Sequence, residues 1–444
     1  MRIKAAGLSP NIDKQRERDI LDVYSKHEVD AGNQGLSVRP TISSDFDKNE
    51  HKLYEQYGLE PKSITQMYDV VRASTATYVD ATGKIRTAGV NEPRIDYSSG
   101  QGRLLVEEAR TNLLTRSEAF SNSVWVRNNV SVTANAIVSP DGTLTADKLV
   151  ETSTTNIHTL NQPLPSSSGT YTFSVFIKAS EKNNVRVDIS DGATAAVGGV
   201  FNLSTGTSSL VTGGSWTNIS TSSVQYPNGW WKCVVTATQG GGTVVNPRIN
   251  LLDANGIPNY LGDGTSGIYI WGAQLEQGST PSSYIPTEAS AVTRAADNVS
   301  RVLGDEFNAN EFSVYCDFSV GSGFFPAAFH FGDGTSSNRI ILHRPEINST
   351  LNTSFVLRVV VVGVTQTLVI PSSAKKAVIT YKAGIYKAYA NGVLIGSLSA
   401  ALPPISVNTI GKGHSSEYCN GTIMDYKVFP KVLSDQECQE LTKI

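Results

Sequence analysis

The chain has 444 residues, which is too long for one hydrophobic core and suggests about three units. Only 17% of the residues are charged, glycine occurs 38 times, and serine, threonine and asparagine are dense between short apolar runs, a composition typical of β-sandwiches rather than helical bundles. The formal net charge of −3 provides no positive field to concentrate nucleic acid, so nucleic acid is not expected as a partner.

Residues 1–70 carry most of the helical signal. Ser9 and Pro10 fit an N-cap and a first helical position, and a second helix is predicted after Ser44. The apolar positions at helical spacing are Ile12, Ile20, Val23, Tyr24 and His27 in the first helix, and Phe46, Leu53, Tyr54 and Tyr57 in the second. Two short amphipathic helices cannot bury enough surface to fold alone, so we expect this segment to dock, either on a larger particle or on the chain's own sandwiches.

Residues 71–111 are predicted to form a hairpin-like lead-in. Val79 precedes the turn Asp80-Ala81-Thr82-Gly83, Ile85 opens the return strand, and Pro93 excludes a central strand. Charges of both signs are mixed here, which is typical of solvated ion pairs or of an interface between subunits: Arg72, Arg86, Arg94 and Arg110 with Asp80, Asp96, Glu107 and Glu108. Their spacing gives no sign of a catalytic carboxylate pair.

Residues 112–295 are predicted to form a β-sandwich, because several strands alternate apolar and polar side chains. The predicted core face carries Tyr171, Phe173, Val175, Ile177, Val185, Val187, Ile189, Ile249 and Leu251. The opposite face is predicted to carry Phe176, Lys178, Arg186, Asp188, Arg248 and Asn250. In the segment GWWKC, Trp231 belongs with Cys233 in the core and Trp230 points to the other side, whereas Trp271 is expected to be buried.

The outward face has the chemistry of a sugar-binding sheet. A glycan offers paired hydroxyls that suit Arg, Asp and Asn, and C–H faces that stack on an exposed ring. The candidate glycan-binding residues are Phe176, Arg186, Asp188, Arg248, Asn250 and Trp230. An ordinary solvated sandwich face is the alternative interpretation.

Two oxygen-rich loops are candidates for a structural calcium ion. They contain Asp253 and Asn255 in one loop and Asp263 in the other. Asp-Gly and Asn-Gly are also the commonest hairpin turn residues, and this turn interpretation is favoured. No cofactor is expected to be required.

Residues 296–444 are predicted to form a second sandwich. Phe312 to Phe318 alternates, Phe355 to Val362 is long enough for a central strand, and Asn391-Gly392 marks a hairpin. A closing helix is predicted at 434–441, with Ser434 as N-cap and Glu437 at the capping-box position.

Export and membrane insertion are not predicted. The opening residues MRIKAAGLSP lack the apolar core of a signal peptide, and no stretch reaches the roughly 18 apolar residues of a membrane span. The four scattered cysteines, Cys233, Cys316, Cys419 and Cys438, are expected to be buried thiols, with a bridge between Cys419 and Cys438 as the alternative.

Two groups of motifs resemble known families. The segments Arg72 to Phe120 (with VDATGKIRTAGVNEPRIDY and LLVEEARTNLLTRSEAF) and Gly267 to Asp297 (with GIYIWGAQLEQGSTPSSYIPTEASAVTRAAD) resemble segments of bacteriophage virion proteins. In those proteins a carbohydrate-binding-module-like jelly roll is mounted on tail fibres, head fibres or capsid decorations. The succession ANGV, IG, NGTI and LSDQE in the last third resembles the concanavalin A-like, laminin-G-like lectin fold. The resemblances imply a particle protein that contacts surfaces.

Catalysis is not expected. Glucanases of the lectin-like fold carry Glu-x-Asp-x-Glu on one strand, whereas the nearest strand here, Phe312 to Phe318, has a single acidic residue, Asp317. The sequence also lacks a phosphate-binding glycine loop, a nucleophile elbow and a metalloprotease helix. A depolymerase is therefore disfavoured.

The sequence predicts a mainly β protein with two β-sandwich (jelly-roll) domains in tandem and a short helical N-terminal docking segment. The expected boundaries are 1–70, 71–111, 112–295 and 296–444. We expect a virion structural protein, made in the host cytoplasm and exposed on the particle. Its expected partners are other virion proteins, through the N-terminal segment, further copies of itself, and host-surface polysaccharide bound weakly by many copies. The alternative is a purely structural decoration or connector that cements neighbouring virion subunits.

Overall fold

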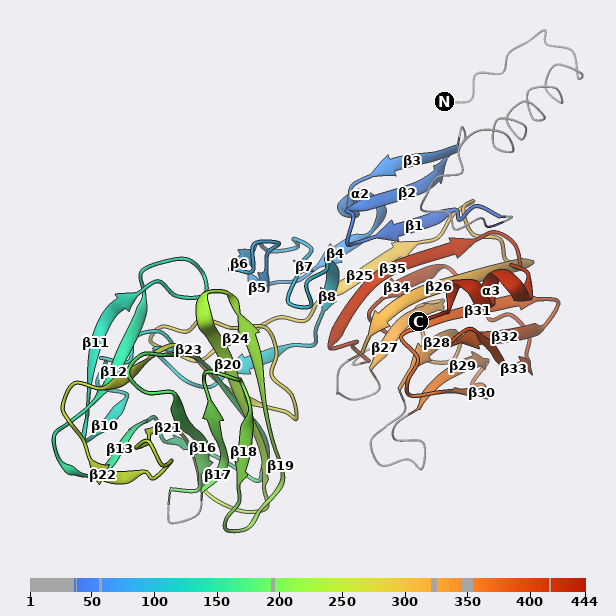
Figure 1. The fold of residues 1–444 in the computed structure, drawn as a ribbon. Helices are drawn as coiled ribbons and strands as arrows, with labels where there is room; N and C mark the ends of the chain where they lie inside the picture. Colours follow the sequence, from blue (N-terminus) through green and yellow to red (C-terminus); the bar gives the residue numbers. More distant parts are fainter. Residues whose placement is uncertain are drawn as a thin grey trace, which may run out of the picture.

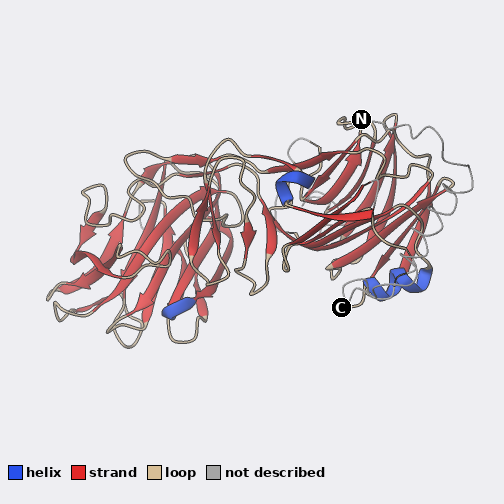
Figure 2. Cartoon of the chain, turned by 90° about the horizontal axis from the view of Figure 1, so that it is seen from above, coloured by secondary structure: helices blue, strands red, loops and turns tan. Residues whose placement is uncertain are grey.

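The computed structural model describes residues 36, 38–55, 58–192, 196–320, 326–344, 354–414 and 417–444. The described chain is mainly β, as predicted, and forms two sandwiches that lie side by side (Figure 1). A second view shows strands throughout both sandwiches (Figure 2). The first predicted helix, with Ile12 to His27, lies outside the described residues.

The first sandwich pairs two antiparallel sheets. One sheet has the order β11 (Val130–Ile137), β12 (Ala146–Glu151), β23 (Gly267–Gln277), β15 (Gly169–Ala179), β20 (Trp230–Gln239) and β19 (Trp216–Tyr226). The other has the order β10 (Val126–Asn128), β13 (Thr155–Asn161), β21 (Val244–Leu251), β16 (Asn184–Ser190), β17 (Ala196–Asn202) and β18 (Ser208–Val211), with β14 (Leu164–Pro165) paired to β21 and β22 (Asn259–Leu261) paired to β13. The one-turn 3-10 helix Pro227–Gly229 links β19 to β20.

The core of the first sandwich confirms the predicted alternation. Its buried residues include the whole predicted inward set: Tyr171, Phe173, Val175, Ile177, Val185, Val187, Ile189, Ile249 and Leu251. Cys233 and Val235 also lie in this core, and Trp231 packs against it while partly buried. A strand period of two therefore identified the faces of β15, β16 and β21 from the sequence alone.

The second sandwich also pairs two sheets. One has the order β3 (Gly58–Lys62), β2 (Glu50–Glu55), β1 (Ile42–Asp45), β35 (Gly421–Phe429), β26 (Glu311–Ser319), β31 (Lys376–Lys382), β32 (Ile385–Ala390) and β33 (Val393–Ser399), with β8 (Arg103–Val106) on β35 and β7 (Ile95–Asp96) on β8. The other has the order β30 (Val364–Ile370), β29 (Phe355–Val361), β28 (Arg339–His343), β27 (Ala327–Gly332), β34 (Val407–Ile410), β25 (Asn298–Val302) and β4 (Asp69–Val71).

The strand alternation, the hairpin turn and the closing helix predicted for this second sandwich are confirmed. Phe312, Val314, Cys316 and Phe318 of β26 lie in its core. The hairpin between β32 and β33 turns at Asn391 and Gly392, both with positive φ, 52° and 76°. The closing helix α3 (Asp435–Leu441) has a complete capping box between Ser434 and Glu437. All four cysteines of the chain are buried free thiols, as expected.

The second predicted helix is wrong. The residues after Ser44 form β1, β2 and β3, and the only helix in the described part of this segment is the single turn α2 (Ile64–Met67). A turn at Phe46–Asn49, with Asn49 at φ 54°, reverses the chain between β1 and β2. Phe46 and Leu53 lie in the second core, and β1 pairs with β35 at the far end of the sequence (Figure 1). The described part of the docking segment thus packs on the chain's own sandwich, which was the open alternative.

The second sandwich therefore draws strands from both sides of the first. β4 pairs with β25, and β8 pairs with β35, so chain segments before and after the first sandwich meet in the same sheets. The predicted lead-in hairpin is present as β5 (Ala76–Val79) and β6 (Ile85–Ala88), with Val79 opposite Ile85. A second small pair, β9 (Arg110–Asn112) with β24 (Val292–Arg294), lies where the chain enters and leaves the first sandwich.

Buried ion pairs join these entering and leaving segments. Arg72 Nη1 donates to Asp297 Oδ1 at 2.9 Å, and Arg94 bonds both Asp297 and Glu107, the latter with Nη1 2.8 Å from Oε2. Burial raises the pKa of Glu107, but the charges of Arg294 and Arg94 outweigh it and hold this pKa well below its ordinary value. The expectation of solvated pairs is therefore wrong for Arg72, Arg94 and Glu107, which are at most 6% exposed.

Candidate functional site

The candidate site lies on the outer face of the sheet that contains β16 and β21. These strands pair antiparallel, with Arg186 opposite Asn250 and Asp188 opposite Arg248. Because alternate residues of a strand share a face, all four side chains lie on the face opposite the core. The sequence predicted this grouping, and the structure brings the four residues together.

Asp188 is the centre of this group. Its Oδ2 accepts from Arg186 Nε at 2.6 Å and from Asn250 Nδ2 at 3.1 Å, and its Oδ1 accepts from Arg248 Nε at 2.6 Å. Asp188 is fully buried beneath these groups, whereas the arginine side chains keep 21% and 25% of their surface exposed. A buried carboxylate needs such donors, and here three of them satisfy it.

The neighbouring strand leaves room for this arrangement. Gly198 on β17 lies opposite Asp188, and a Cβ at Gly198 would lie 2.6 Å from the Asp188 Cα and 2.2 Å from the Val187 carbonyl oxygen. Any larger residue would therefore displace the Asp188 backbone. Glycine here permits the close approach of the two strands beneath the arginines.

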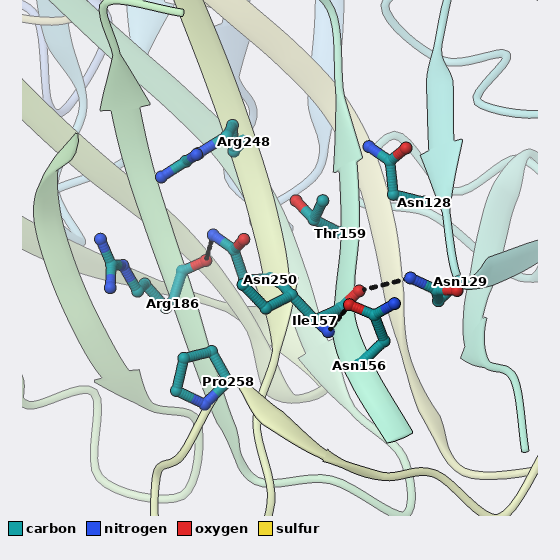
Figure 3. A pocket seen from close by; sticks show the side chains of 9 residues that line it. All are labelled: Asn128, Asn129, Asn156, Ile157, Thr159, Arg186, Arg248, Asn250 and Pro258. Atoms are coloured by element: carbon teal, nitrogen blue, oxygen red, sulfur yellow. Dashed lines mark hydrogen bonds between the residues drawn. The ribbon is translucent and has the colours of Figure 1, made fainter. Parts of the chain in front are cut away.

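The arginines open into a groove of about 380 Å³. It is lined by Asn128, Asn129, Asn156, Ile157, Thr159, Arg186, Arg248, Asn250 and Pro258. The two arginines lie at one side and the asparagines Asn128, Asn129 and Asn156 at the other (Figure 3). The groove thus has a cationic side and an amide side.

The amide side comes from β10, from Asn129 directly after it, and from β13. Asn129 Nδ2 donates to the Ile157 carbonyl at 3.0 Å, and Asn156 Oδ1 accepts from the Ile157 N–H at 2.8 Å (Figure 3). Asn128 Nδ2 donates to Asn161 Oδ1 at 3.1 Å. These bonds fix the amides, and within the described part of the chain they leave the Asn128 Oδ1 and the Asn156 Nδ2 without a protein partner.

The sequence-based reasoning missed this amide side. Alternation in Thr155–Asn161, where His158 and Leu160 are fully buried, gives a signal for two other lining residues but none for the three asparagines. Their spacing of two places Ile157 and Thr159 on the outer face. The lateral order of the strands, with β13 beside β21 and β10 beside β13, is a long-range property that this alternation does not reveal.

Phe176 and Trp230 do not belong to this face, so their assignment to an exposed sugar platform is wrong. They lie on β15 and β20 of the opposite sheet, and each is 1% exposed. Both pack in a cluster with Trp271, Tyr284 and Ile85 of the lead-in hairpin. Ile85 and Tyr284 cover the outer face of their sheet, so these side chains form a separate buried cluster and not an exposed face. The predicted burial of Trp271 is confirmed.

The two calcium candidates are tight turns closed by their own aspartates, and neither links two strands that pair with each other. Asp253 Oδ1 accepts from the backbone N–H groups of Asn255 and Ile257 at 2.9 and 2.7 Å. Asp263 Oδ1 accepts from two backbone N–H groups, both at 2.7 Å, and its Oδ2 accepts from the Ser266 hydroxyl. These bonds hold the pKa of Asp253 below its ordinary value. Across the described residues, no group of three or more His, Cys, Asp or Glu side chains is placed to share a metal ion.

Comparisons with known proteins do not assign the chain to a family. No family model matches the chain, and no curated protein matches it. Among solved structures, it is similar to the mouse laminin alpha1 chain, domains LG4-5, with 9% identity, 62% of this chain and 86% of that chain covered, and a TM-score of 0.21. A similarity at this level says nothing about function. In the described part of the chain, no helix has the length and apolar character needed to cross a membrane.

Proposed function

We propose that the chain is a non-enzymatic surface protein that binds glycan in the groove of its first sandwich. The observation that carries the proposal is the groove itself, where two arginines and Asn250 are fixed by one buried carboxylate. Such pre-ordered donors lose little freedom when a ligand binds. Bidentate donors and amides are the groups that recognise sugar hydroxyls and substituents.

The biological setting of the proposal rests on the sequence. The segments Arg72 to Phe120 and Gly267 to Asp297, which resemble phage virion proteins, support a place on a bacteriophage particle and host-surface polysaccharide as the glycan. Weak binding at one groove would be multiplied by many copies on a particle. Attachment to the particle through the N-terminal segment stays a prediction.

A structural connector is the second candidate. It is favoured by exposed apolar side chains at the turns of two hairpins in the second sandwich. Val362 is 81% exposed, Val364 66% and Val393 52%, and such side chains suit contact with another subunit. In that case the groove of the first sandwich would be an ordinary solvated face.

The test is to fill the groove. Thr159 lies in the middle of the lining, so Thr159→Trp places a large side chain where a ligand would lie. Ser209→Trp on β18 is the matched control, because Ser209 is exposed on an edge strand of the same sheet and does not line the groove. We expect the full-length wild type and Ser209→Trp to bind host-surface polysaccharide equally and Thr159→Trp to lose binding. Equal binding by all three proteins would refute the proposed site.

A further inference from the structure

Charge is unevenly distributed in the groove. Its lining includes two guanidinium groups and no carboxylate among the described residues. Asp188 lies beneath the lining and is fully buried, so it offsets one of the two positive charges without presenting an oxygen to the groove. The arginine side of the groove therefore carries a net charge of one positive unit.

The arginines are also arranged to receive an anion. Each guanidinium uses its Nε to bond Asp188, at 2.6 Å in both cases. Within the described residues, the Nη groups of Arg186 and Arg248 have no protein partner. Asp188 thus acts as a positioning residue: it fixes the two planar groups and leaves their outer N–H donors for a ligand.

The groove lacks the feature on which neutral sugars commonly rely. No aromatic ring is among the described residues that line it, and Phe176 and Trp230 are buried on the other sheet. Stacking of a sugar C–H face on a ring is therefore not available here. The affinity of this site must come mainly from hydrogen bonds, and charge-assisted bonds are the strongest of these.

We infer that the groove selects an acidic glycan, one whose sugar carries a carboxylate. The carboxylate binds the Nη groups of Arg186 and Arg248, and the hydroxyls of the same or the next sugar bind the free amide atoms of Asn128 and Asn156 on the other side. This inference rests on the proposed function and adds the ligand class. A carboxylate carries one negative charge, which matches the net charge of the arginine side.

The test uses full-length protein on an array of polysaccharides. Uronic-acid polymers are presented beside the same polymers after chemical reduction of their carboxylates to alcohols, together with neutral and phosphodiester-linked glycans. We expect binding to uronic-acid polymers, a loss of about tenfold or more after carboxyl reduction, and weakening as salt is raised. Stronger binding to the phosphodiester glycans would overturn the assignment of a carboxylate.

A variant tests the charge of the groove without disturbing Asp188. Asn156→Asp keeps the oxygen that accepts from the Ile157 N–H and adds a negative charge to the lining. Asn310→Asp makes the same change at an exposed position of the second sandwich. We expect Asn156→Asp to lose binding to uronic-acid polymers by about tenfold and Asn310→Asp to retain it.

The outcomes separate the two proposals. Equal binding of acidic and carboxyl-reduced polymers, unaffected by Asn156→Asp but abolished by Thr159→Trp, would overturn the acidic-glycan inference and leave the proposed function intact. Absence of binding to every glycan on the array would overturn both.

Discussion

Asp188 provides a quantitative test of how the groove is built. The change Asp188→Asn keeps the shape of the side chain but removes its charge, and it replaces one acceptor oxygen with an NH₂ group. In the wild type, the Nε of each arginine lies 2.6 Å from an Asp188 oxygen. In the variant, the Nε of one arginine would face the new NH₂ group, which is also a donor, and the Nε of the other arginine would bond a neutral amide oxygen. Charge-assisted hydrogen bonds contribute about 1.5–3 kcal/mol each and neutral ones about 0.5–1.5 kcal/mol.

Losing one charge-assisted bond and weakening the other gives an expected destabilisation of about 2–3 kcal/mol, since the partly exposed arginines regain some hydration. For a domain of this size, the melting temperature of the first sandwich should fall by about 4–12 °C. Calorimetry of the full-length protein measures this. Asp305→Asn, at an exposed aspartate of the second sandwich, is the control and should change little. A melting temperature for Asp188→Asn equal to that of this control would refute the network.

Three further outcomes are expected. Burial lowers the pKa of His51 and His330 to about 4 and that of His343 to about 3, so protonation of these side chains favours the unfolded chain. The free energy of unfolding of the second sandwich should therefore fall as pH drops from about 6.5 towards 4, by about 2 kcal/mol per histidine at pH 5. In urea titrations, His330→Asn should reduce this loss. Because the Asp253 and Asp263 oxygens already accept hydrogen bonds within their turns, a metal chelator should leave the melting curve unchanged, whereas a clear fall would support a structural calcium ion. Incubation with host capsule or lipopolysaccharide should release no reducing ends; release that a single Asp or Glu substitution abolishes would contradict the non-enzymatic proposal.

The sequence shows which side chains share one face of a strand, but it does not show which other segments pack against that face. Alternation in β16 and β21 correctly grouped Arg186, Asp188, Arg248 and Asn250, because a period of two is a local property of each strand. The same alternation correctly turned Phe176 away from the first core. It could not show that this second face is itself covered by the lead-in hairpin and by Tyr284.

Long-range pairing explains the other differences. The apolar spacing of Phe46 and Leu53 fits a helix until the turn at Asn49 is recognised, and the partner of β1 lies at the opposite end of the chain. The buried ion pairs of Arg72 and Arg94 with Asp297 likewise depend on contacts between residues about 200 positions apart. Mixed charges close together in sequence resemble a solvated surface, and only the fold shows that they are buried.

A glycan bound in the groove would lie on the outer face of β13, β16 and β21. Amide hydrogen exchange of the full-length protein, with and without a saturating oligosaccharide that binds on the array, locates the ligand most directly. Binding in the groove predicts slower exchange in the segments that border it, around Asn128–Asn129, Asn156–Thr159 and Pro258. Slower exchange confined to the second sandwich, with these segments unchanged, would contradict it.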